Sequence, residues 1–262
     1  MKLGIIGSGK IVHDFLTIAD QIPDLELTAL ATTKRSHKIG LDLQKEYQIN
    51  KLYDNNADLF NDPDVDTVYV AVPNSLHFSI SKEALEAGKN VICEKPFVAT
   101  VDEARELKAI ADQKKLIIIE AITNIYLENF KFIEENLDKI APIHVVNLNY
   151  TQYSSRYDAF LAGDIQPAFD PKKDGGALMD LGIYNLHIII KLFVSQNLSI
   201  ISLQCRKILT PQASCTSVIL TNKLVQSPLK TVFHLMSALL KVKKVHLLFM
   251  VILMKYLKSE CN

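Results

Sequence analysis

The sequence has few of the residues that build disulfide-rich proteins. It contains no tryptophan and four cysteines, which form no CxxC pair and show no regular spacing. We therefore expect no disulfide framework. This composition favours a reducing, cytoplasmic environment. Asp14 and Asp20 interrupt any apolar stretch at the N-terminus, so no signal peptide is expected either.

The zero net charge hides two unlike segments. Residues 1–193 carry 28 Asp and Glu against 20 Lys and Arg, whereas residues 194–262 carry nine bases and a single acid, Glu260. The later segment also lacks glycine and aspartate altogether. The acidic body argues against nucleic-acid binding, which requires a basic surface for phosphates. We therefore treat residues 194–262 as an aberrant basic-apolar tail.

The first fifteen residues, MKLGIIGSGKIVHDF, read as a strand, a glycine turn and the start of a helix. Gly7 permits a tight turn, and Gly9 lets the backbone come close to a pyrophosphate at the helix start. Val12 stands where a third glycine or alanine is usual, so an ordinary strand-to-helix turn is the alternative. The predicted cofactor cradle is Gly7, Ser8, Gly9, Lys10 and Ile11.

Strands and helices alternate through the first 120 residues. Several of the strands are apolar on both faces, which is typical of a parallel sheet covered by helices on both sides. We expect an α/β fold, a doubly wound Rossmann domain over residues 1–120. The predicted strands cover residues 3–6, 25–31, 51–53, 66–72, 90–93 and 116–120. The predicted helices begin at residue 11 and cover 36–47, 54–60, 74–87 and 100–114.

The end of the second strand carries no carboxylate. In a dinucleotide-binding domain an acid at this place usually bonds the adenosine ribose. Thr32 and Thr33, followed by Lys34 and Arg35, would instead suit a 2′-phosphate, which favours NADP over NAD. The alternative is that Lys34 and Arg35 are simply a solvated helix start.

Two more polar clusters follow predicted strands. Ligands of such sheets bind outside the carboxyl ends of the strands. We therefore expect cofactor contacts from both clusters. For His77 a partly exposed residue at a helix start is an equally good interpretation. The clusters are Val72, Pro73, Asn74 and His77 after the fourth strand, and Glu94 and Lys95 after the fifth.

Lys95 is the candidate proton-handling residue. A lysine normally keeps its proton at neutral pH, but partial burial and a nearby cationic nicotinamide ring both favour its neutral form. Such a lysine can exchange a proton with a substrate hydroxyl during hydride transfer. The alternative is a structural lysine paired with a carboxylate.

A helix predicted after Gly175-Gly176 and extending to Phe193 adds three polar side chains. Asp180, Tyr184 and His187 follow i, i+4, i+7 spacing, which places them on one face. Asp180 would hold Lys95 or orient substrate hydroxyls, and Tyr184 would donate a proton to a carbonyl oxygen. His187 would add a substrate contact beside those of Lys95, Asp180 and Tyr184, the alternative being a structural histidine at the end of this face.

The stretches GIIGSGKI, AVPNSLH, CEKPF and DGGALMDLGIYNLH, in this order and at these intervals, resemble the Gfo/Idh/MocA oxidoreductase family. The match covers about residues 1–193. By that resemblance Lys95 is the lysine near the hydride-transfer site and Asp180 falls on the motif aspartate. Tyr184 falls where many members have a catalytic histidine and some have tyrosine.

The resemblance implies an oxidoreductase that transfers a hydride between NADP or NAD and a secondary alcohol or ketone of a sugar, inositol or diol. It also implies a second domain of α/β character, which begins over residues 121–193. No metal ligand set is expected. Association into a homo-oligomer is left open, because members often associate through the sheet of this domain. The rival interpretation is a protein that binds cofactor but is catalytically impaired.

The family pattern stops near Val194. We interpret the tail as the product of a shifted reading frame followed by an early stop. The gene sequence would contradict this interpretation if the tail keeps its frame and no other nearby frame encodes family-like residues. A rival interpretation is a membrane element at Val245–Met254, but ten apolar residues are too few for a span. Surface adsorption of a basic-apolar helix is a further alternative. We expect partial disorder or a poorly packed helix.

Overall fold

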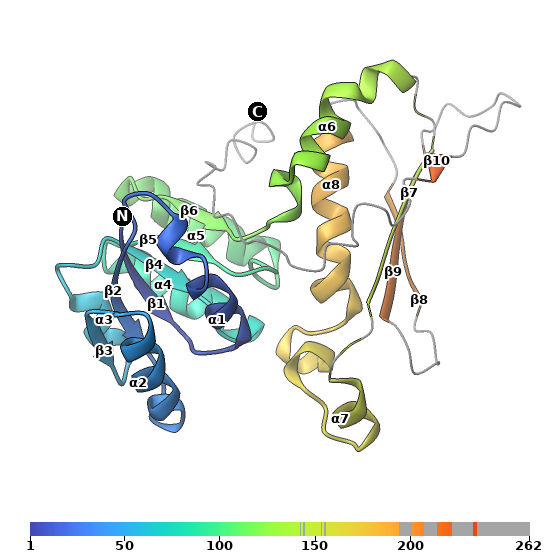
Figure 1. Cartoon of the computed structure of the whole chain (residues 1–262). Coiled ribbons are helices and arrows are strands. Elements are labelled where there is room, and N and C mark those ends of the chain that lie inside the picture. Colours follow the sequence, from blue (N-terminus) through green and yellow to red (C-terminus); the bar gives the residue numbers. More distant parts are fainter. Residues whose placement is uncertain are drawn as a thin grey trace, which may run out of the picture. The chain divides into compact units, whose positions relative to one another are not determined.

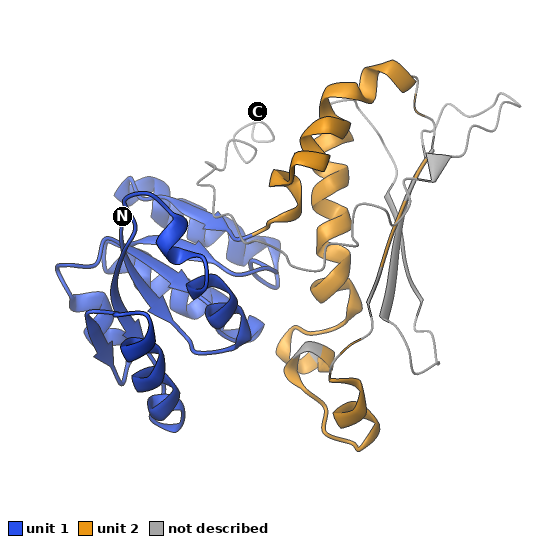
Figure 2. Ribbon diagram, viewed as in Figure 1, with its two compact units in different colours: residues 1–121, 246–262 blue, residues 122–245 orange. Residues whose placement is uncertain are grey.

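The computed structural model describes residues 1–193 except 142, 144, 153 and 155, together with three later strand segments (Figure 1). The chain divides into two compact units (Figure 2). The first is described over Met1–Ala121, and the second begins at Ile122. Each unit is considered by itself.

The first unit is built on a six-stranded parallel sheet in the order β3-β2-β1-β4-β5-β6. This order, with the chain crossing over at β1, is that of a dinucleotide-binding Rossmann sheet, as the sequence predicted. The strands are β1 (Lys2–Ile6), β2 (Glu26–Ala31), β3 (Lys51–Tyr53), β4 (Thr67–Val70), β5 (Asn90–Cys93) and β6 (Ile118–Glu120).

Helices lie on both faces of this sheet, because successive strand residues point to opposite sides and both sides are apolar. Ile5 belongs to a core shared with α1 and α2, and Ile6 belongs to a separate core shared with α3, α4 and α5. The helices are α1 (Lys10–Leu16), α2 (His37–Glu46), α3 (Asn56–Asn61), α4 (His77–Glu86) and α5 (Val101–Lys114), with 3₁₀ turns η1 (Ala19–Gln21), η2 (Lys34–Ser36) and η3 (Asn74–Leu76).

Local sequence signals set the ends of these helices. Thr100 and Glu103 form the expected capping box at the start of α5, each side chain bonding the other's backbone N–H. Gly88, with a φ of 81°, follows α4 in the left-handed conformation that glycine favours.

The second unit pairs a helical layer with a mixed sheet. Its helices are η4 (Asn124–Tyr126), α6 (Glu128–Asn136), η5 (Leu137–Ile140), α7 (Tyr157–Leu161), η6 (Pro167–Phe169), η7 (Pro171–Lys173), the π-helical turn η8 (Leu178–Gly182) and α8 (Ile183–Phe193). Val146 and Leu148 of β7 (Val145–Gln152) share a core with Phe130 of α6 and Ile189 of α8.

Two features of this unit go beyond the expectations from the sequence. Residues Tyr157–Leu161 form the short helix α7. The tail, for which partial disorder or a poorly packed helix was expected, contributes three strands. β8 (Ile201–Arg206), β9 (Ser214–Thr221) and β10 (Phe233–His234) join β7 in the order β10-β7-β9-β8, in which β7, β9 and β8 run antiparallel and β10 pairs with β7 in parallel.

These three strands fall within the segment called the basic-apolar tail. The interpretation of that tail as an out-of-frame product remains a prediction. The apolar stretch Val245–Met254 and its basic flanks lie outside the described residues. Among the residues that are described, no helix combines the length and apolar character needed to cross a membrane.

Candidate functional site

The glycine turn after β1 is tight at one end and open at the other. Gly7 has a φ of +116°, and its N–H donates to the carbonyl of Ala31 at 3.1 Å. A Cβ on Gly7 would lie 2.2 Å from the carbonyl oxygen of Ala71, so only glycine fits there. A Cβ on Gly9, the N-cap of α1, would meet no atom within 4 Å. The turn therefore leaves open space beside Gly9.

The end of β2 presents hydroxyl groups and cations. Thr32 is 5% exposed, and its Oγ1 has no hydrogen-bond partner among the described atoms. Thr33 Oγ1 lies 3.0 Å from Ser36 Oγ, and Lys34 and Arg35 are exposed in the turn η2. Both interpretations of Lys34 and Arg35, as phosphate ligands or as a solvated helix start, are compatible with this arrangement.

His77 is completely buried, rather than partly exposed as one interpretation of the sequence held. Its Nδ1 lies 2.8 Å from the carbonyl oxygen of Pro96, and its Nε2 lies 2.9 Å from the carbonyl oxygen of Val72. The imidazole thus bridges the segments that follow β4 and β5. Pro73 is exposed and Asn74 is half-buried beside this bridge.

The segment after β5 holds Lys95 in a half-buried position between two anchored neighbours. Glu94 is 7% exposed and accepts a hydrogen bond from Tyr69 Oη at 2.7 Å. On the other side, Phe97 N–H donates to Glu120 Oε1 at 3.0 Å. Burial raises the pKa of Glu94, although the bond from Tyr69 and the charge of Lys95 act in the opposite direction.

Tyr69 and Glu120 were not predicted as part of this site. Tyr69 reads as one more apolar position within a buried strand. Glu120 offered a signal, because it is an acid at the carboxyl end of a predicted strand beside the Lys95 segment. The register pairs Cys93 of β5 with Glu120 of β6, which brings that carboxylate next to the segment.

The structure brings the predicted cofactor residues of the first unit to one edge of the sheet. Gly7 touches the ends of β2 and β4, His77 joins the ends of β4 and β5, and Glu120 joins β5 to β6. Ser8 and Ile11 are half-buried in the same turn, and Lys10 Nζ pairs with Asp14 at 2.8 Å. We refer to this set as the carboxyl edge.

Asp180, Tyr184 and His187 belong to the second unit, and all three are half-buried. Asp180 lies in the π-helical turn η8, so the α-helical spacing assumed from the sequence does not hold between it and Tyr184 of α8. The ring of Tyr184 packs edge-on against Tyr150 of β7, with the centroids 5.6 Å apart. Asn124 Nδ2 donates to the Tyr184 carbonyl at 2.8 Å.

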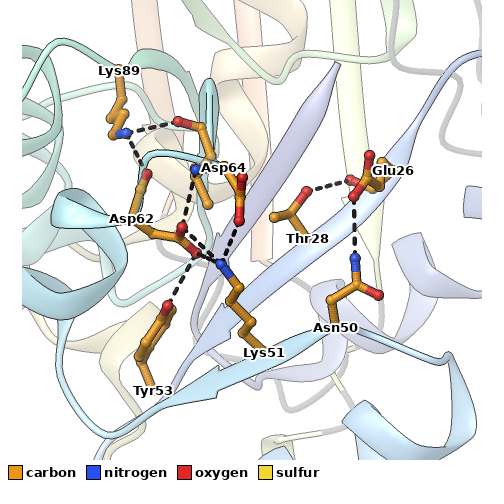
Figure 3. Close-up of polar contacts among 9 residues, drawn as sticks. Glu26, Thr28, Asn50, Lys51, Tyr53, Asp62, Asp64 and Lys89 are labelled. Carbon is orange, nitrogen blue, oxygen red and sulfur yellow. Dashed lines mark hydrogen bonds and ion pairs between the residues drawn. The ribbon is translucent and has the colours of Figure 1, made fainter.

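A second polar cluster occupies the opposite, amino edge of the Rossmann sheet (Figure 3). Asp62, whose side chain is 1% exposed, accepts hydrogen bonds from Lys51 Nζ at 2.9 Å and from Tyr53 Oη at 3.0 Å. Lys51 also pairs with Asp64 at 2.7 Å. Lys89 Nζ donates to the carbonyls of Asp62 and Val65 at 2.7 Å. We call this set the amino-edge cluster.

The hydrogen bonds of the amino-edge cluster set its charge states. Burial alone would raise the pKa of Asp62, but hydrogen bonds from Lys51, from the Asp64 backbone and from Tyr53 outweigh it and lower that pKa. The two bonded carboxylates raise the pKa of Lys51. Across the described residues, no group of three or more His, Cys, Asp and Glu side chains could hold a metal ion.

Comparison with known proteins points to the same family as the sequence motifs. Scyllo-inositol 2-dehydrogenase (NADP(+)) of Bacillus subtilis is 33% identical over 193 residues, which are 74% of this chain and 58% of that protein. D-xylose 1-dehydrogenase (NADP(+)) of Hypocrea jecorina is 34% identical over 201 residues, which are 71% and 51% of the two chains. The chain thus spans between half and three fifths of the length of these relatives.

Solved structures confirm the fold. A 3-ketoreductase from Actinomadura kijaniata in complex with NADP superposes with a TM-score of 0.61 at 23% identity, covering 78% of this chain and 58% of that chain. Residues 1–122 also match the family model described as an oxidoreductase family with an NAD-binding Rossmann fold. Through residues 1–122, the chain therefore belongs to the Gfo/Idh/MocA family of oxidoreductases, as its sequence resemblance indicated.

Proposed function

We propose that the carboxyl edge binds NADP or NAD, with NADP preferred. The turn at Gly7 and Gly9 leaves room for the backbone to approach a pyrophosphate, and N–H groups at a helix start suit its charge. At the end of β2, the exposed Thr33 and Arg35 side chains would be available to a ribose or a phosphate. The residues present therefore fit the cofactor.

Three regions of the carboxyl edge would contact different parts of the cofactor. The cradle Gly7 to Ile11 would hold the pyrophosphate, and Thr32, Thr33 and Arg35 would hold the adenosine end. Val72, Pro73 and Asn74, with Glu94 and Lys95, would border the nicotinamide. NADP is preferred because this edge offers exposed cations and no carboxylate at the end of β2.

We further propose that the chain catalyses oxidation of a secondary alcohol or reduction of a ketone. When bound, the cofactor supplies hydride transfer. Lys95 would accept the proton of the substrate hydroxyl, or return it in the reverse direction. Tyr184 would share this proton handling, with Asp180 orienting hydroxyls and His187 adding a substrate contact. The observation that carries this proposal is the half-buried lysine held beside the cofactor cradle at one sheet edge.

The substrate class follows from the relatives. The named relatives are dehydrogenases of an inositol and of xylose, and further relatives are trans-1,2-dihydrobenzene-1,2-diol dehydrogenases. We propose a sugar, inositol or related diol for this chain.

The test combines a binding titration with a turnover screen. NADPH and NADH fluorescence would be titrated with the full chain, and oxidation of a panel of polyols and sugars would be followed at 340 nm. Lys95→Ala should abolish turnover while leaving NADPH binding within a few-fold, and the exposed Lys45→Ala on α2 should change neither. Binding without any turnover would overturn the catalytic part and leave a cofactor-binding protein. Absence of binding would overturn both parts.

We also propose a cytoplasmic location. Cys93, the cysteine whose side chain the structure describes, is unpaired and buried, and its burial raises the pKa of the thiol. A buried unpaired thiol is compatible with a reducing compartment. Cell fractionation that found the chain outside the cytoplasm would contradict this.

A further inference from the structure

The segment Glu94–Phe97 is anchored from three neighbouring elements. Tyr69 of β4 donates to the Glu94 carboxylate, His77 of α4 contacts the Pro96 carbonyl, and Glu120 of β6 accepts the Phe97 N–H. Lys95 N–H additionally donates to Glu94 Oε2 at 3.2 Å. The backbone is therefore fixed immediately before and immediately after Lys95.

His77 ties this segment to a second one. Both of its ring nitrogens lie within 2.9 Å of main-chain carbonyl oxygens, one after β4 and one after β5. A carbonyl oxygen can only accept, so either neutral tautomer makes one of these hydrogen bonds and the doubly protonated ring makes both. Because the ring is fully buried, water does not compete for these contacts. The position of the backbone after β5 thus depends on the position of the backbone after β4.

Glu120 completes the arrangement from the opposite side. Its carboxylate reaches the Phe97 N–H across the β5–β6 pair, a separation of 23 residues in sequence. A hydrogen bond from a backbone N–H to a carboxylate is stronger than one between neutral groups. Without it, Phe97 and the preceding proline would lose their tie to β6.

We propose that His77 and Glu120 are positioning residues that set the location of Lys95 by holding the backbone on its C-terminal side. This proposal rests on the proposed function for its catalytic consequence. A displacement of about 1 Å at a reacting group can cost about 100-fold in rate, so these anchors bear on turnover more than on affinity. His77 thereby influences the cofactor site through Val72 and Pro96.

The first experiment observes Lys95 without cofactor or substrate. Lysines of the full chain would be ¹³C-dimethylated and their NMR signals recorded, with the Lys95 signal assigned by its loss in Lys95→Arg. Glu120→Ala and His77→Asn should shift or broaden that signal and leave most other lysine signals unchanged. Glu120→Gln, which keeps an oxygen facing the Phe97 N–H, should restore the wild-type signal.

The second experiment measures catalysis on the same variants. Glu120→Ala should lower kcat by up to about 100-fold while KM for substrate and the Kd for NADPH change less than about threefold, and Glu120→Gln should recover most of kcat. If His77→Asn fails to fold, the two Glu120 variants decide the question by themselves. Should the wild-type chain show no turnover, the proposed function fails, and the NMR comparison still tests the positioning role.

The control is Asp62→Asn in the amino-edge cluster. It removes a buried carboxylate's charge from the far edge of the same sheet, so it lowers stability without touching the Lys95 segment. An unchanged Lys95 signal and unchanged kcat in this variant support positioning. Equal disturbance by Asp62→Asn and Glu120→Ala, or an undisturbed Lys95 in Glu120→Ala, would overturn it.

Discussion

The two edges of the Rossmann sheet carry polar residues for different purposes. At the amino edge, Lys51, Asp62 and Lys89 bond to one another and to nearby backbone (Figure 3). At the carboxyl edge, side-chain bonds fix the backbone, while a methyl group on Gly9 would meet no atom of the described residues within 4 Å and the cations of η2 are exposed. The first arrangement is complete within the protein, and the second is complete only with a ligand.

This difference shows which polar groups in the same small domain contribute to folding and which to binding. The amino-edge cluster contributes stability because its buried polar groups are hydrogen-bonded, the Asp62 carboxylate to Lys51 and Tyr53 and the Lys89 ammonium to two backbone carbonyls. Exposed cations and open backbone at a helix start instead leave room for a charged ligand. Mutations at the two edges should therefore separate stability from cofactor affinity.

The largest expected effect comes from Gly7→Ala. The new methyl group would lie 2.2 Å from the Ala71 carbonyl oxygen, on a backbone whose φ of +116° already excludes side chains. We expect the free energy of unfolding to fall by about 3 kcal/mol or more. Urea denaturation followed by circular dichroism measures this, and a stability equal to wild type would show that the turn is not as tight as described.

Gly9→Ala is the matched substitution two residues away. Its methyl group meets no protein atom within 4 Å, so stability should fall by about 1 kcal/mol or less, from weaker capping of α1. The same methyl group would occupy the approach to the pyrophosphate, and the Kd for NADPH should rise by about tenfold or more. Unaltered NADPH affinity in this variant would place the cofactor elsewhere.

The next largest effect is expected at the amino edge. Asp62→Asn removes the charge that Lys51 and Tyr53 contact and should lower the free energy of unfolding by about 2 kcal/mol. Asp64→Asn is the matched control, because its side chain is 54% exposed while it pairs with the same lysine. That variant should cost about 0.5 kcal/mol. A change in NADPH affinity in either variant would contradict the claim that the amino edge contributes to stability but not to cofactor binding.

A smaller effect is expected at the adenosine end of the carboxyl edge. Arg35→Ala removes an exposed cation from the turn η2, so the ratio of NADH to NADPH dissociation constants should fall by about tenfold, the value of one charged hydrogen bond. Thermal unfolding should be unchanged. An unaltered ratio would assign Arg35 to a solvated helix start, the interpretation the sequence left open.

The smallest expected effect is on how strongly the free energy of unfolding falls at acidic pH. The pKa of Asp62 is lower in the folded chain than in the unfolded one, so the unfolded state binds more protons in the interval between the two values. Its contribution is present above about pH 4, the unfolded value, and is lost as pH falls through the lower folded pKa. The free energy of unfolding, measured by denaturation at a series of pH values from 6 to 2, should therefore fall less with decreasing pH for Asp62→Asn than for wild type.

Much of the first unit could be predicted from local sequence. The strand Asn90–Cys93, the capping box at Thr100 and the glycine stop at Gly88 are found as expected, because turn chemistry and apolar periodicity act over a few residues. The segment 154–173 was less predictable. Its prolines suggested only a loop, and the short helix α7 within it spans five residues.

The sequence predicts the Rossmann order of elements, the glycine turn, the lysine after β5 and the family to which these belong. The three-dimensional arrangement was needed to show that His77 is buried between two carbonyls and that Tyr69 and Glu120 anchor the Lys95 segment. It was also needed to show that the Thr32 hydroxyl has no hydrogen-bond partner among the described residues. Propensity and periodicity act between neighbouring residues. The contacts of Tyr69 with Glu94, of His77 with Pro96 and of Glu120 with Phe97 instead join residues 19 to 25 positions apart, which meet only once strand register is set.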